Sequence, residues 1–208
     1  CTHFPGSDMA DTSFTQNQIR IFTSAIDAIR GRGIDPGLVH AANSGAINEI
    51  RDSYFNLVRP GLILYGISPR QDLGVSLKPV MSLKTKIVFT KRVPKGSGIS
   101  YGHSYHTKKD TTVVTLPIGY GDGYPRILSN KADVLIRGRR FRISGKVCMD
   151  YILVDVGDER AGTVDEAVLI GAYGKEQISA HELALLADTI SYEIVCGIGS
   201  RVPRVYPV

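Results

Sequence analysis

The sequence predicts two structural classes in succession, an α/β segment followed by a mostly antiparallel β-strand domain. Up to about residue 68, apolar runs of strand length alternate with helical patterns, which is the order typical of a parallel α/β fold. Residues 69–78 have the Pro, Gly and Asp content of a linker. From Val80 onward, short β-branched runs are separated by Gly, Pro and Asp, which favours an antiparallel barrel or sandwich.

The first segment contains one clear helix. Residues 15–30 carry apolar side chains at close to helical spacing, namely Ile19, Phe22, Ile26 and Ile29. Caps are available before the helix, and Gly31-Arg32-Gly33 is expected to end it.

The other helices and strands predicted in the first segment are shorter than this helix. A strand is predicted over 38–42, a second helix is predicted to start near Asn43-Ser44-Gly45 and to run through Ile50, and Leu62–Tyr65 is predicted to be a strand. About two and a half β/α units are visible, against eight in a complete barrel, so this segment is too short to close a barrel by itself.

The second segment reads as a series of short strands. Arg137-Gly138 is predicted to form a tight turn between two of them, and Ser179-Ala180-His181-Glu182 is a capping box predicted to start a helix. The predicted strands are Thr85–Thr90, Thr111–Leu116, Asp133–Ile136, Phe141–Ile143, Tyr151–Val156 and Ala167–Ile170.

Composition narrows the class of protein. With 43% hydrophobic residues and no run of about 18 apolar residues, the chain can bury a core and has no transmembrane segment. The net charge of +5 permits an anionic partner without requiring one. The three cysteines form no C-x-x-C pattern, which favours a reducing, cytosolic setting, and the spacing of the five histidines predicts no metal site. The chain begins with Cys-Thr-His-Phe and no initiator Met, so we expect it to be part of a longer protein.

Two stretches of the first segment are candidates for binding an anion. Asn43-Ser44-Gly45 stands where a strand ends and a helix begins, which suits a phosphate, although a plain helix cap is the simpler interpretation of this triplet alone. Arg59, within Val58-Arg59-Pro60-Gly61, either lies on the surface or projects into the mouth of a barrel, and the residues alone do not decide between the two.

Three stretches of the second segment are candidates for chemistry. Tyr101 follows a glycine-rich turn and stands between small residues, so its phenol is either available for proton transfer or packed on a sheet. The loop 119–126 contains two tyrosines and three glycines, which suits either close approach of a ligand or a tight structural loop. Residues 146–150 could offer a backbone amide to an anion, although core packing of Cys148 and Met149 is the simpler explanation.

The order and spacing of these motifs resemble the C-terminal part of a bacterial alanine racemase, a fold-type III enzyme that depends on pyridoxal 5'-phosphate. The resemblance runs from end to end of the chain and rests on several motifs in succession: Thr2-His3-Phe4, His40–Ser44, Val58–Gly66, Lys78–Met81, Ile99–Gly102, Ile118–Arg126, Gly145–Asp150, Thr189–Glu193 and Arg201–Tyr206.

The resemblance implies that residues 1–76 are the C-terminal part of a pyridoxal-phosphate-binding (β/α)8 (TIM-like) barrel and that residues 77–208 are the C-terminal β-domain. It implies a cytoplasmic homodimer with composite active sites, a small amino acid as substrate, and neither nucleic acid nor a membrane as partner. The implied reaction interconverts L- and D-alanine by two-base proton transfer at Cα and supplies D-alanine for peptidoglycan.

The resemblance also assigns the cofactor-binding residues. Ser44, the amides of Gly61 and Leu62, and the hydroxyl of Tyr192 would hold the phosphate, with Asn43 beside them. Arg59 would face the pyridine nitrogen, where a fixed guanidinium should leave that nitrogen unprotonated and so favour racemisation over transamination.

For catalysis the resemblance assigns one face of Cα to Tyr101. A free phenol has a pKa of about 10, so its action as a base would need help from Arg59 and from His3, which would hydrogen-bond Arg59. Met149 would bind the substrate carboxylate through its backbone N–H, and Tyr120 would limit substrate size at the entrance. Asp8 and Ile190 map to the same corridor, and Lys146 stands where an arginine is expected in many relatives.

The lysine that forms the Schiff base with the cofactor is absent, because the Lys-Ala-x-x-Tyr-Gly motif of the family does not occur in this chain. The arginine that pairs with the substrate carboxylate in the first half of the barrel is absent too. The chain alone is therefore expected to be inactive.

Three alternatives remain beside alanine racemisation. A related racemase of serine or another small amino acid would share the motifs. A non-catalytic scaffold derived from the racemase would lack the reaction. A basic β-barrel could bind nucleic acid through Arg137-Gly138-Arg139-Arg140-Phe141-Arg142, although this run is more simply a solvated hairpin and lacks paired stacking aromatics.

Overall fold

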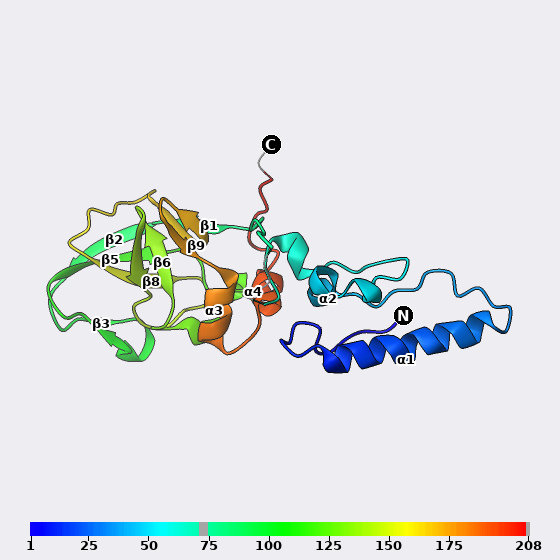
Figure 1. Ribbon diagram of the computed structural model, residues 1–208. Coiled ribbons are helices and arrows are strands. Elements are labelled where there is room, and N and C mark those ends of the chain that lie inside the picture. The colour runs from blue at the N-terminus through cyan, green and yellow to red at the C-terminus, as the bar shows by residue number, and fades with distance from the viewer. Residues whose placement is uncertain (71–74, 207–208) are drawn as a thin grey trace. The chain divides into compact units, whose positions relative to one another are not determined.

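The structure is a computed structural model that describes residues 1–70 and 75–206. It divides into two compact units, a first unit from Cys1 to Val80 and a second unit from Met81 to Val208 (Figure 1). The division lies just after the predicted linker, of which residues 71–74 fall outside the described part of the chain. None of the helices in the described part combines the length and the apolar character that a membrane crossing requires.

The first unit is dominated by α1 (Ser13–Arg30), which confirms the helix predicted from the spacing of apolar residues. The Asp11 carboxylate starts the helix by accepting the N–H of Ser13 at 2.9 Å, and Gly31 ends it by donating to the carbonyl of Asp27 at 2.8 Å. Ile19 and Ile26 are buried, whereas Ile29 is 37% exposed. The apolar face of the helix is thus only partly covered within this unit.

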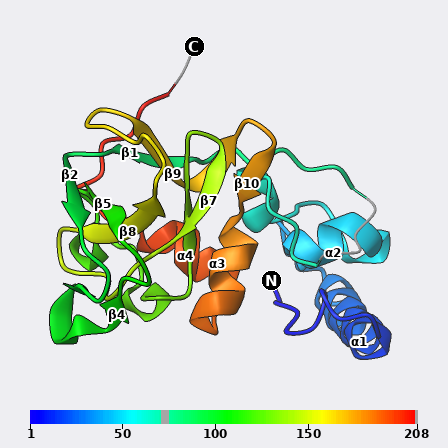
Figure 2. The same cartoon turned by 90° about the vertical axis from the view of Figure 1, so that its left-hand side faces the viewer.

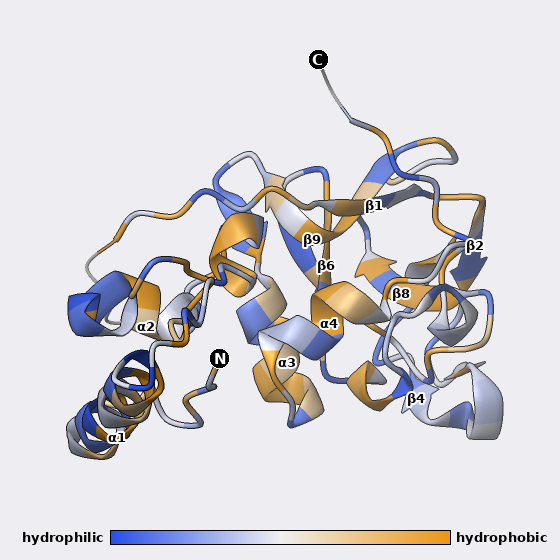
Figure 3. Cartoon of the chain, turned by 90° about the vertical axis from the view of Figure 1, so that its right-hand side faces the viewer, coloured by the Kyte–Doolittle hydropathy of each residue, from blue (hydrophilic) through white to orange (hydrophobic). Residues whose placement is uncertain are grey.

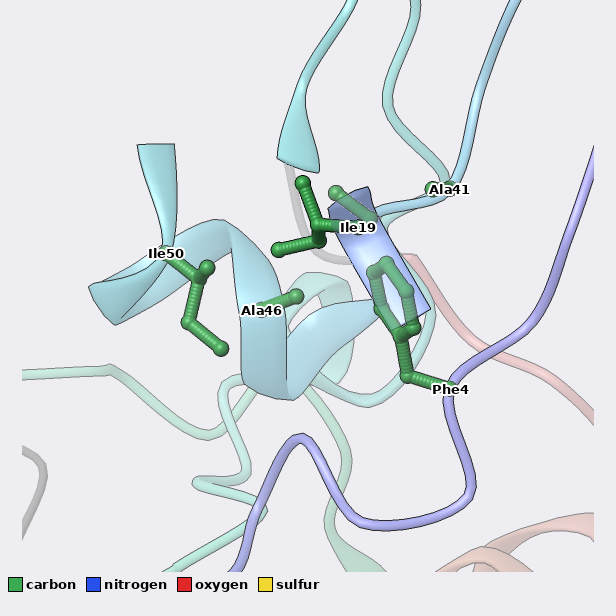
Figure 4. Packing of buried hydrophobic residues seen from close by; sticks show 6 residues of the cluster. Phe4, Ile19, Ala41, Ala46 and Ile50 are labelled. Atoms are coloured by element: carbon green, nitrogen blue, oxygen red, sulfur yellow. The ribbon is translucent and has the colours of Figure 1, made fainter. Parts of the chain in front are cut away.

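A small core cluster joins α1 to the rest of the first unit (Figure 4). Phe4, Ile19, Ala41, Ala46 and Ile50 point toward one another in the close-up and bring together segments that are far apart in sequence. Phe22, Tyr54 and Phe55 pack against the cluster, and Phe22 meets Phe55 edge to face with ring centroids 5.2 Å apart.

The short elements of the first unit differ in part from the prediction. The second helix is confirmed as α2 (Ser44–Glu49) and is followed by the 3-10 turn η1 (Arg51–Ser53). The segment 38–42 forms no strand beyond a single parallel bridge between His40 and Leu57.

The strand predicted over Leu62–Tyr65 is wrong, because these residues form the 3-10 helix η2. The N–H of Leu64 bonds back to the carbonyl of Gly61 at 3.0 Å, and Gly66 leaves the turn at φ 70°. A Cβ at Gly66 would lie 1.8 Å from the carbonyl oxygen of Lys78, so the turn needs glycine there. Turn geometry therefore overrides the apolar composition of the run.

The strands of the second unit, in the part of the chain that the structure describes, form three antiparallel sheets (Figure 1). One sheet has the order β1-β9-β6-β7 with β10 paired to β9, a second has the order β2-β5-β8 (Figure 2), and β3 pairs with β4. The mostly antiparallel β-domain is thereby confirmed. The strands are β1 (Leu83–Lys86), β2 (Phe89–Val93), β3 (Gly98–Ile99), β4 (Tyr105–His106), β5 (Thr111–Leu116), β6 (Asp133–Ile136), β7 (Arg139–Arg142), β8 (Ile152–Gly157), β9 (Glu166–Tyr173) and β10 (Glu176–Ile178).

The predicted strand over Thr85–Thr90 is split between two sheets. Its first part belongs to β1, which pairs with β9, and its last part belongs to β2, which pairs with β5. Between them the N–H of Ile87 bonds to the carbonyl of Asp165 and that of Val88 to Thr115, both at 3.0 Å. A continuous β-branched run thus changes sheets, which its composition does not signal.

The turn predicted at Arg137-Gly138 is confirmed. It joins β6 to β7 with Ile136 opposite Arg139 and has positive φ at both central residues, 51° and 74°. This is the pattern of a two-residue hairpin whose twist matches that of the strands.

Two helices complete the second unit, α3 (Ala180–Ala187) and α4 (Ser191–Gly197). The Ser179 hydroxyl accepts the N–H of Glu182 at 3.0 Å, as expected for the predicted cap. Arg140 of β7 ties α3 to the sheet, because its guanidinium lies 2.6 Å from the Glu182 carboxylate and 3.0 Å from that of Glu176.

Much of the core of the second unit comes from its strands. In β8 the buried Ile152, Val154 and Val156 alternate with more exposed residues, which is the pattern of a strand with one face turned inward, and Figure 3 colours much of this strand as hydrophobic. In β6, by contrast, Val134, Leu135 and Ile136 are buried in succession. The remaining short turns are η3 (Tyr101–His103), η4 (Tyr120–Asp122) and η5 (Arg126–Leu128).

Candidate active site

The guanidinium of Arg59 is held by four groups of the first unit. Its Nη2 donates to the carbonyls of Thr2 at 2.9 Å and Ala41 at 3.2 Å. Nη2 also lies 3.2 Å from Nδ1 of His3, and Nη1 lies 2.5 Å from Nδ1 of His40. Arginine carries only donors, so both histidine nitrogens accept these bonds. The bond expected between His3 and Arg59 is therefore present, and the guanidinium is fixed in place.

His40 is a member of this cluster that sequence reasoning did not single out. Burial lowers the pKa of its imidazole, and the nearby Arg59 lowers it further. A neutral ring is what the geometry requires, since Nδ1 must offer a lone pair to the guanidinium. The N–H of Thr2 donates to the carbonyl of His40 at 3.2 Å, and His40 forms a parallel bridge with Leu57. These pairings bring distant segments together, so local sequence spacing does not signal the contact of His40 with Arg59.

Asn43 caps α2 and ties it to the start of the chain. Its Oδ1 accepts the N–H of Ala46 at 3.2 Å and the hydroxyl of Ser7 at 2.6 Å, and its Nδ2 donates to the carbonyl of Phe4 at 3.2 Å. The helix-cap interpretation of this residue is thus confirmed. A part for Asn43 in cofactor binding stays a prediction.

Ser44 and Gly61 lie next to each other although they are 17 residues apart in sequence. The Ser44 side chain is buried, and its Oγ accepts the N–H of Gly61 at 3.0 Å. Leu62, which follows, is buried as well and begins η2. One serine hydroxyl and the backbone of two consecutive residues are therefore gathered at one place in the first unit.

This donor set fits the phosphate of pyridoxal 5'-phosphate. The Ser44 oxygen acts as acceptor toward Gly61, so the hydroxyl proton is left to donate to a phosphate oxygen. Backbone N–H groups at a turn are common partners of phosphate, and the fixed positive charge of Arg59 in the same unit suits an anionic ligand. The residues present are thus chemically suited to the cofactor that the sequence implies.

Tyr101 lies in the loop between β3 and β4 and is 73% exposed. The phenol is therefore presented to the surface of the second unit, and the alternative of a tyrosine packed on a sheet is wrong. The loop turns sharply, with positive φ at Ser100, Gly102 and His103.

Ser100 has the most unusual backbone of this loop, at φ 64° and ψ −179°. Side chains other than glycine's rarely occupy this region, and a residue held there costs on the order of 1–3 kcal/mol. Its hydroxyl donates to the carbonyl of Lys146 at 2.9 Å and accepts the N–H of the same residue at 3.1 Å. The two bonds offset the strain and join the Tyr101 loop to residues 145–148.

An open cavity of about 470 Å³ lies beside this loop in the second unit. Its wall brings the Tyr101 loop together with the segment that precedes Met149. The lining residues are Ser100, Tyr101, Gly102, His103, Thr115, Cys148, Tyr151 and Leu153.

The loops that carry Tyr120 and Met149 are bonded to each other. The N–H of Tyr120 donates to the carbonyl of Cys148 at 2.9 Å, and the N–H of Gly121 donates to the carbonyl of Met149 at 2.8 Å. A Cβ at Gly119 would lie 2.2 Å from the carbonyl oxygen of Cys148, so this close approach depends on glycine. Tyr120 is 42% and Met149 52% exposed, so both can meet a ligand.

An ion-pair bridge stabilises these two loops. Arg201 lies 3.3 Å from the carboxylate of Asp122 and 2.7 Å from that of Asp150, so it links both loops to the C-terminal segment. Asp122 is mostly buried and also accepts the N–H of Gly119 at 2.9 Å. The two carboxylates raise the pKa of Arg201. Neither Arg201 nor Ser100 was predicted as a site residue, because their partners are distant in sequence.

The predicted residues are thus distributed over both units. His3, Asn43, Ser44, Arg59, Gly61 and Leu62 belong to the first unit, and Tyr101, Tyr120, Met149 and Tyr192 to the second. Tyr192 is near the start of α4 and is 40% exposed. Among the residues that the structure describes, no group of three or more His, Cys, Asp or Glu side chains is placed to hold a metal ion.

The basic hairpin proposed as a nucleic-acid surface has its charge compensated. Arg142 lies 2.6 Å from Asp133, Arg137 lies 3.7 Å from Asp165, Arg139 pairs with Glu159, and Arg140 lies among Asp133, Glu176 and Glu182. A surface that binds phosphates by releasing counterions needs uncompensated positive charge. The geometry therefore favours the solvated hairpin.

Two family models match the chain. "Alanine racemase, C-terminal domain" matches residues 80–206, and "Alanine racemase, N-terminal domain" matches residues 1–69.

Curated relatives match almost the whole chain. The alanine racemase of Halothermothrix orenii is 50% identical over 210 residues, and that of Desulfovibrio desulfuricans is 45% identical over 207 residues. Both matches cover 99% of this chain and 55% of the relative, so the chain spans about half the length of the curated relatives it matches.

Solved structures of alanine racemases are also similar to this chain along almost its whole length. The structure of an alanine racemase from Bacillus anthracis with bound L-Ala-P superposes with a TM-score of 0.94 at 38% identity, covering 99% of this chain and 54% of that one. The alanine racemase from Streptomyces coelicolor gives a TM-score of 0.93 at 40% identity, with 98% and 54% covered.

Proposed function

The chain belongs to the alanine racemase family, and we propose that the protein it forms part of interconverts L- and D-alanine with pyridoxal 5'-phosphate. The observation that carries the proposal is the fixed guanidinium of Arg59, in the same unit as the Ser44 hydroxyl, whose oxygen accepts the N–H of Gly61 and whose proton is left to donate. These groups suit the two ends of the cofactor, its ring nitrogen and its phosphate.

When bound, the cofactor withdraws electrons from Cα of the amino acid and so acidifies its proton. Ser44, Gly61 and Leu62 hold the phosphate in this proposal, with Tyr192 adding a hydroxyl and Asn43 keeping α2 in position. A guanidinium keeps its proton at ordinary pH, so Arg59 would stay charged. It would donate a hydrogen bond to the ring nitrogen without protonating it. His3 and His40 hold it in that orientation.

Tyr101 is the base on one face of Cα in this proposal. Its exposure leaves the phenol free to enter the active site of a partner subunit, which is how a homodimer would form composite sites. In this proposal His3, which accepts a bond from Arg59, links the guanidinium toward the phenol that accepts the proton. The base on the other face is a lysine outside this chain.

Met149 and Tyr120 define the substrate in this proposal. The Met149 N–H binds the carboxylate, and the Tyr120 ring narrows the entrance, so that alanine is preferred over larger amino acids. A preference for serine or another small amino acid is the second candidate. The enzyme acts in the cytoplasm and supplies D-alanine for peptidoglycan.

The proposal is tested by fusing this chain to the part of the Halothermothrix orenii relative that lies outside its match. The fusion is expected to convert L-alanine to D-alanine faster than L-serine to D-serine, whereas residues 1–208 alone are expected to be inactive. A folded fusion that racemises neither amino acid contradicts the proposal, and faster turnover of serine favours the second candidate.

A tyrosine variant tests the role of the phenol. Tyr101→Phe in the fusion is expected to lower the racemisation rate by about 10²–10⁴-fold, the usual contribution of a positioned acid or base. Tyr173→Phe, at the end of β9, is the matched control and should leave the rate unchanged. An undiminished rate in Tyr101→Phe would show that the phenol is not a catalytic base.

A further inference from the structure

We propose that Ser100 is a positioning residue that holds Tyr101 in its working place. This inference rests on the proposed function of Tyr101 as a base, and it assigns a separate task to the residue before it. The task is to keep an otherwise unfavourable backbone turn in one conformation.

The turn at Ser100 is unusual for a residue with a side chain. Its φ of 64° with ψ of −179° lies in a region that glycine occupies freely and other residues rarely enter. The chain has 22 glycines and uses one two residues away, at Gly102, yet it places a serine at this position. A residue that is strained where glycine would be relaxed is expected to contribute something that glycine lacks.

The contribution is a two-point anchor. The Ser100 hydroxyl donates to the Lys146 carbonyl at 2.9 Å and accepts the Lys146 N–H at 3.1 Å. It therefore acts as donor and as acceptor toward the backbone of a single residue. The Sγ of Cys148 lies 3.6 Å away on the same side. The loop is thereby bonded to a segment 46 residues further along the chain.

The residues around the Tyr101 loop leave little room for another loop conformation. A Cβ at Gly145 would lie 2.5 Å from the Ser100 Cβ, so the two segments touch at this point. At the other end of the loop, a Cβ at Gly98 would lie 2.7 Å from the His103 ring. The loop is therefore confined on both sides of Tyr101, and its rigidity has a structural source.

The consequence concerns the phenol. Tyr101 is 73% exposed, so its own side chain has few neighbours to hold it, and its position depends on the backbone that carries it. A base must come within hydrogen-bond reach of the proton it removes, and a displacement of about 1 Å can cost about a hundredfold in rate. Ser100 thus acts through the position that it gives to Tyr101.

Two variants of the fusion protein separate the anchor from the backbone conformation. Ser100→Ala removes the hydroxyl and keeps the strain, whereas Ser100→Gly removes the hydroxyl and relieves the strain. If the anchor positions Tyr101, both variants lose at least about tenfold in kcat. Ser97→Ala is the matched control, since the Ser97 hydroxyl bonds to Pro94 in the neighbouring turn, and it should keep full activity.

Isotope effects distinguish positioning from general damage. Because the two enantiomers have equal free energy, kcat/KM must fall equally in both directions, and rates alone cannot identify the affected face. With alanine deuterated at Cα, Ser100→Ala is expected to raise the primary isotope effect for the enantiomer whose proton faces Tyr101, and much less for the other. If the isotope effects for both enantiomers are the same in Ser100→Ala as in the parent, the variant merely contains less active protein, and the proposal is overturned.

Hydrogen exchange of the 208-residue chain gives a readout that needs no catalysis. The amides of residues 98–106 are expected to exchange faster in Ser100→Ala and Ser100→Gly than in the parent and in Ser97→Ala. Unchanged exchange, or full kcat in Ser100→Gly, would show that the hydroxyl holds nothing in place. If exchange accelerates while Tyr101→Phe keeps full activity, the proposed role of Tyr101 fails, and the positioning role fails with it.

Discussion

The two units of this chain bury their apolar side chains to different degrees. In the second unit, Val114, Leu135 and Leu169 are completely buried in antiparallel sheets. In the first unit, Phe14 and Ile21 of α1 are 57% and 56% exposed, and Leu38 is 69% exposed. The small cluster around Ile19 covers only one side of the helix.

The difference follows from how the two kinds of sheet are built. Antiparallel strands pair with neighbours that a short turn supplies, as β6 and β7 do through Arg137-Gly138. Parallel strands need a crossover and further β/α units on each side, and in the described part of the first unit a single parallel bridge joins His40 to Leu57. The antiparallel unit therefore completes its sheets with its own strands, whereas a few β/α units cannot.

The largest difference between the two units is expected in how each unfolds when it is separated from the other. Residues 81–208 alone should fold and unfold cooperatively in urea, because their sheets and core are complete within the unit. Residues 1–80 alone should show no cooperative transition, because one small cluster cannot offset the entropy of ordering the chain. Circular dichroism during urea titration of each piece measures both outcomes, and a sharp transition for residues 1–80 would contradict the comparison.

Deleting one apolar side chain in each unit sharpens the contrast. Leu135→Ala in β6 should lower the free energy of unfolding by roughly 3 kcal/mol, because it leaves a cavity in a closed core. Ile21→Ala on α1 should change it by less than about 0.5 kcal/mol, since the side chain is exposed in this chain. Equal losses in urea denaturation would indicate that the outer face of α1 is covered in solution.

The smallest change in stability is expected when the pH is raised and Tyr105 of the second unit loses its proton. The Tyr105 hydroxyl donates to Asp155 at 2.7 Å, and burial together with this carboxylate raises its pKa to about 12. The folded state thus favours the protonated phenol, whose pKa when free is about 10. Its contribution to stability is fully present below pH 10 and is lost as the pH rises from 10 to 12.

Tyr105→Phe removes this titration. The variant should be less stable than the parent below pH 10, and the gap should narrow between pH 10 and 12. Urea midpoints measured at several pH values for both proteins test this expectation, and parallel curves would show that Tyr105 does not titrate differently in the two states.

Several features could be predicted from residues close together in sequence. The helix α1, the turn at Arg137-Gly138 and the cap at Ser179 depend on local spacing and turn chemistry, and all three are confirmed. The motif order was sufficient to identify the family. The strand predicted at Leu62–Tyr65 failed because its turn depends on Gly66 meeting Lys78, a contact that apolar composition does not encode.

The sequence by itself thus determined the fold class and the family, and it proposed the candidate site residues. The tertiary structure alone decided which partners hold those residues. His3 and His40 meet at Arg59 from 56 and 19 residues away in sequence, Ser44 meets Gly61, and Ser100 is bonded to Lys146. The physical reason is that spacing reports contacts along one element, whereas a hydrogen bond between distant segments forms only when the whole backbone has brought them within about 3 Å.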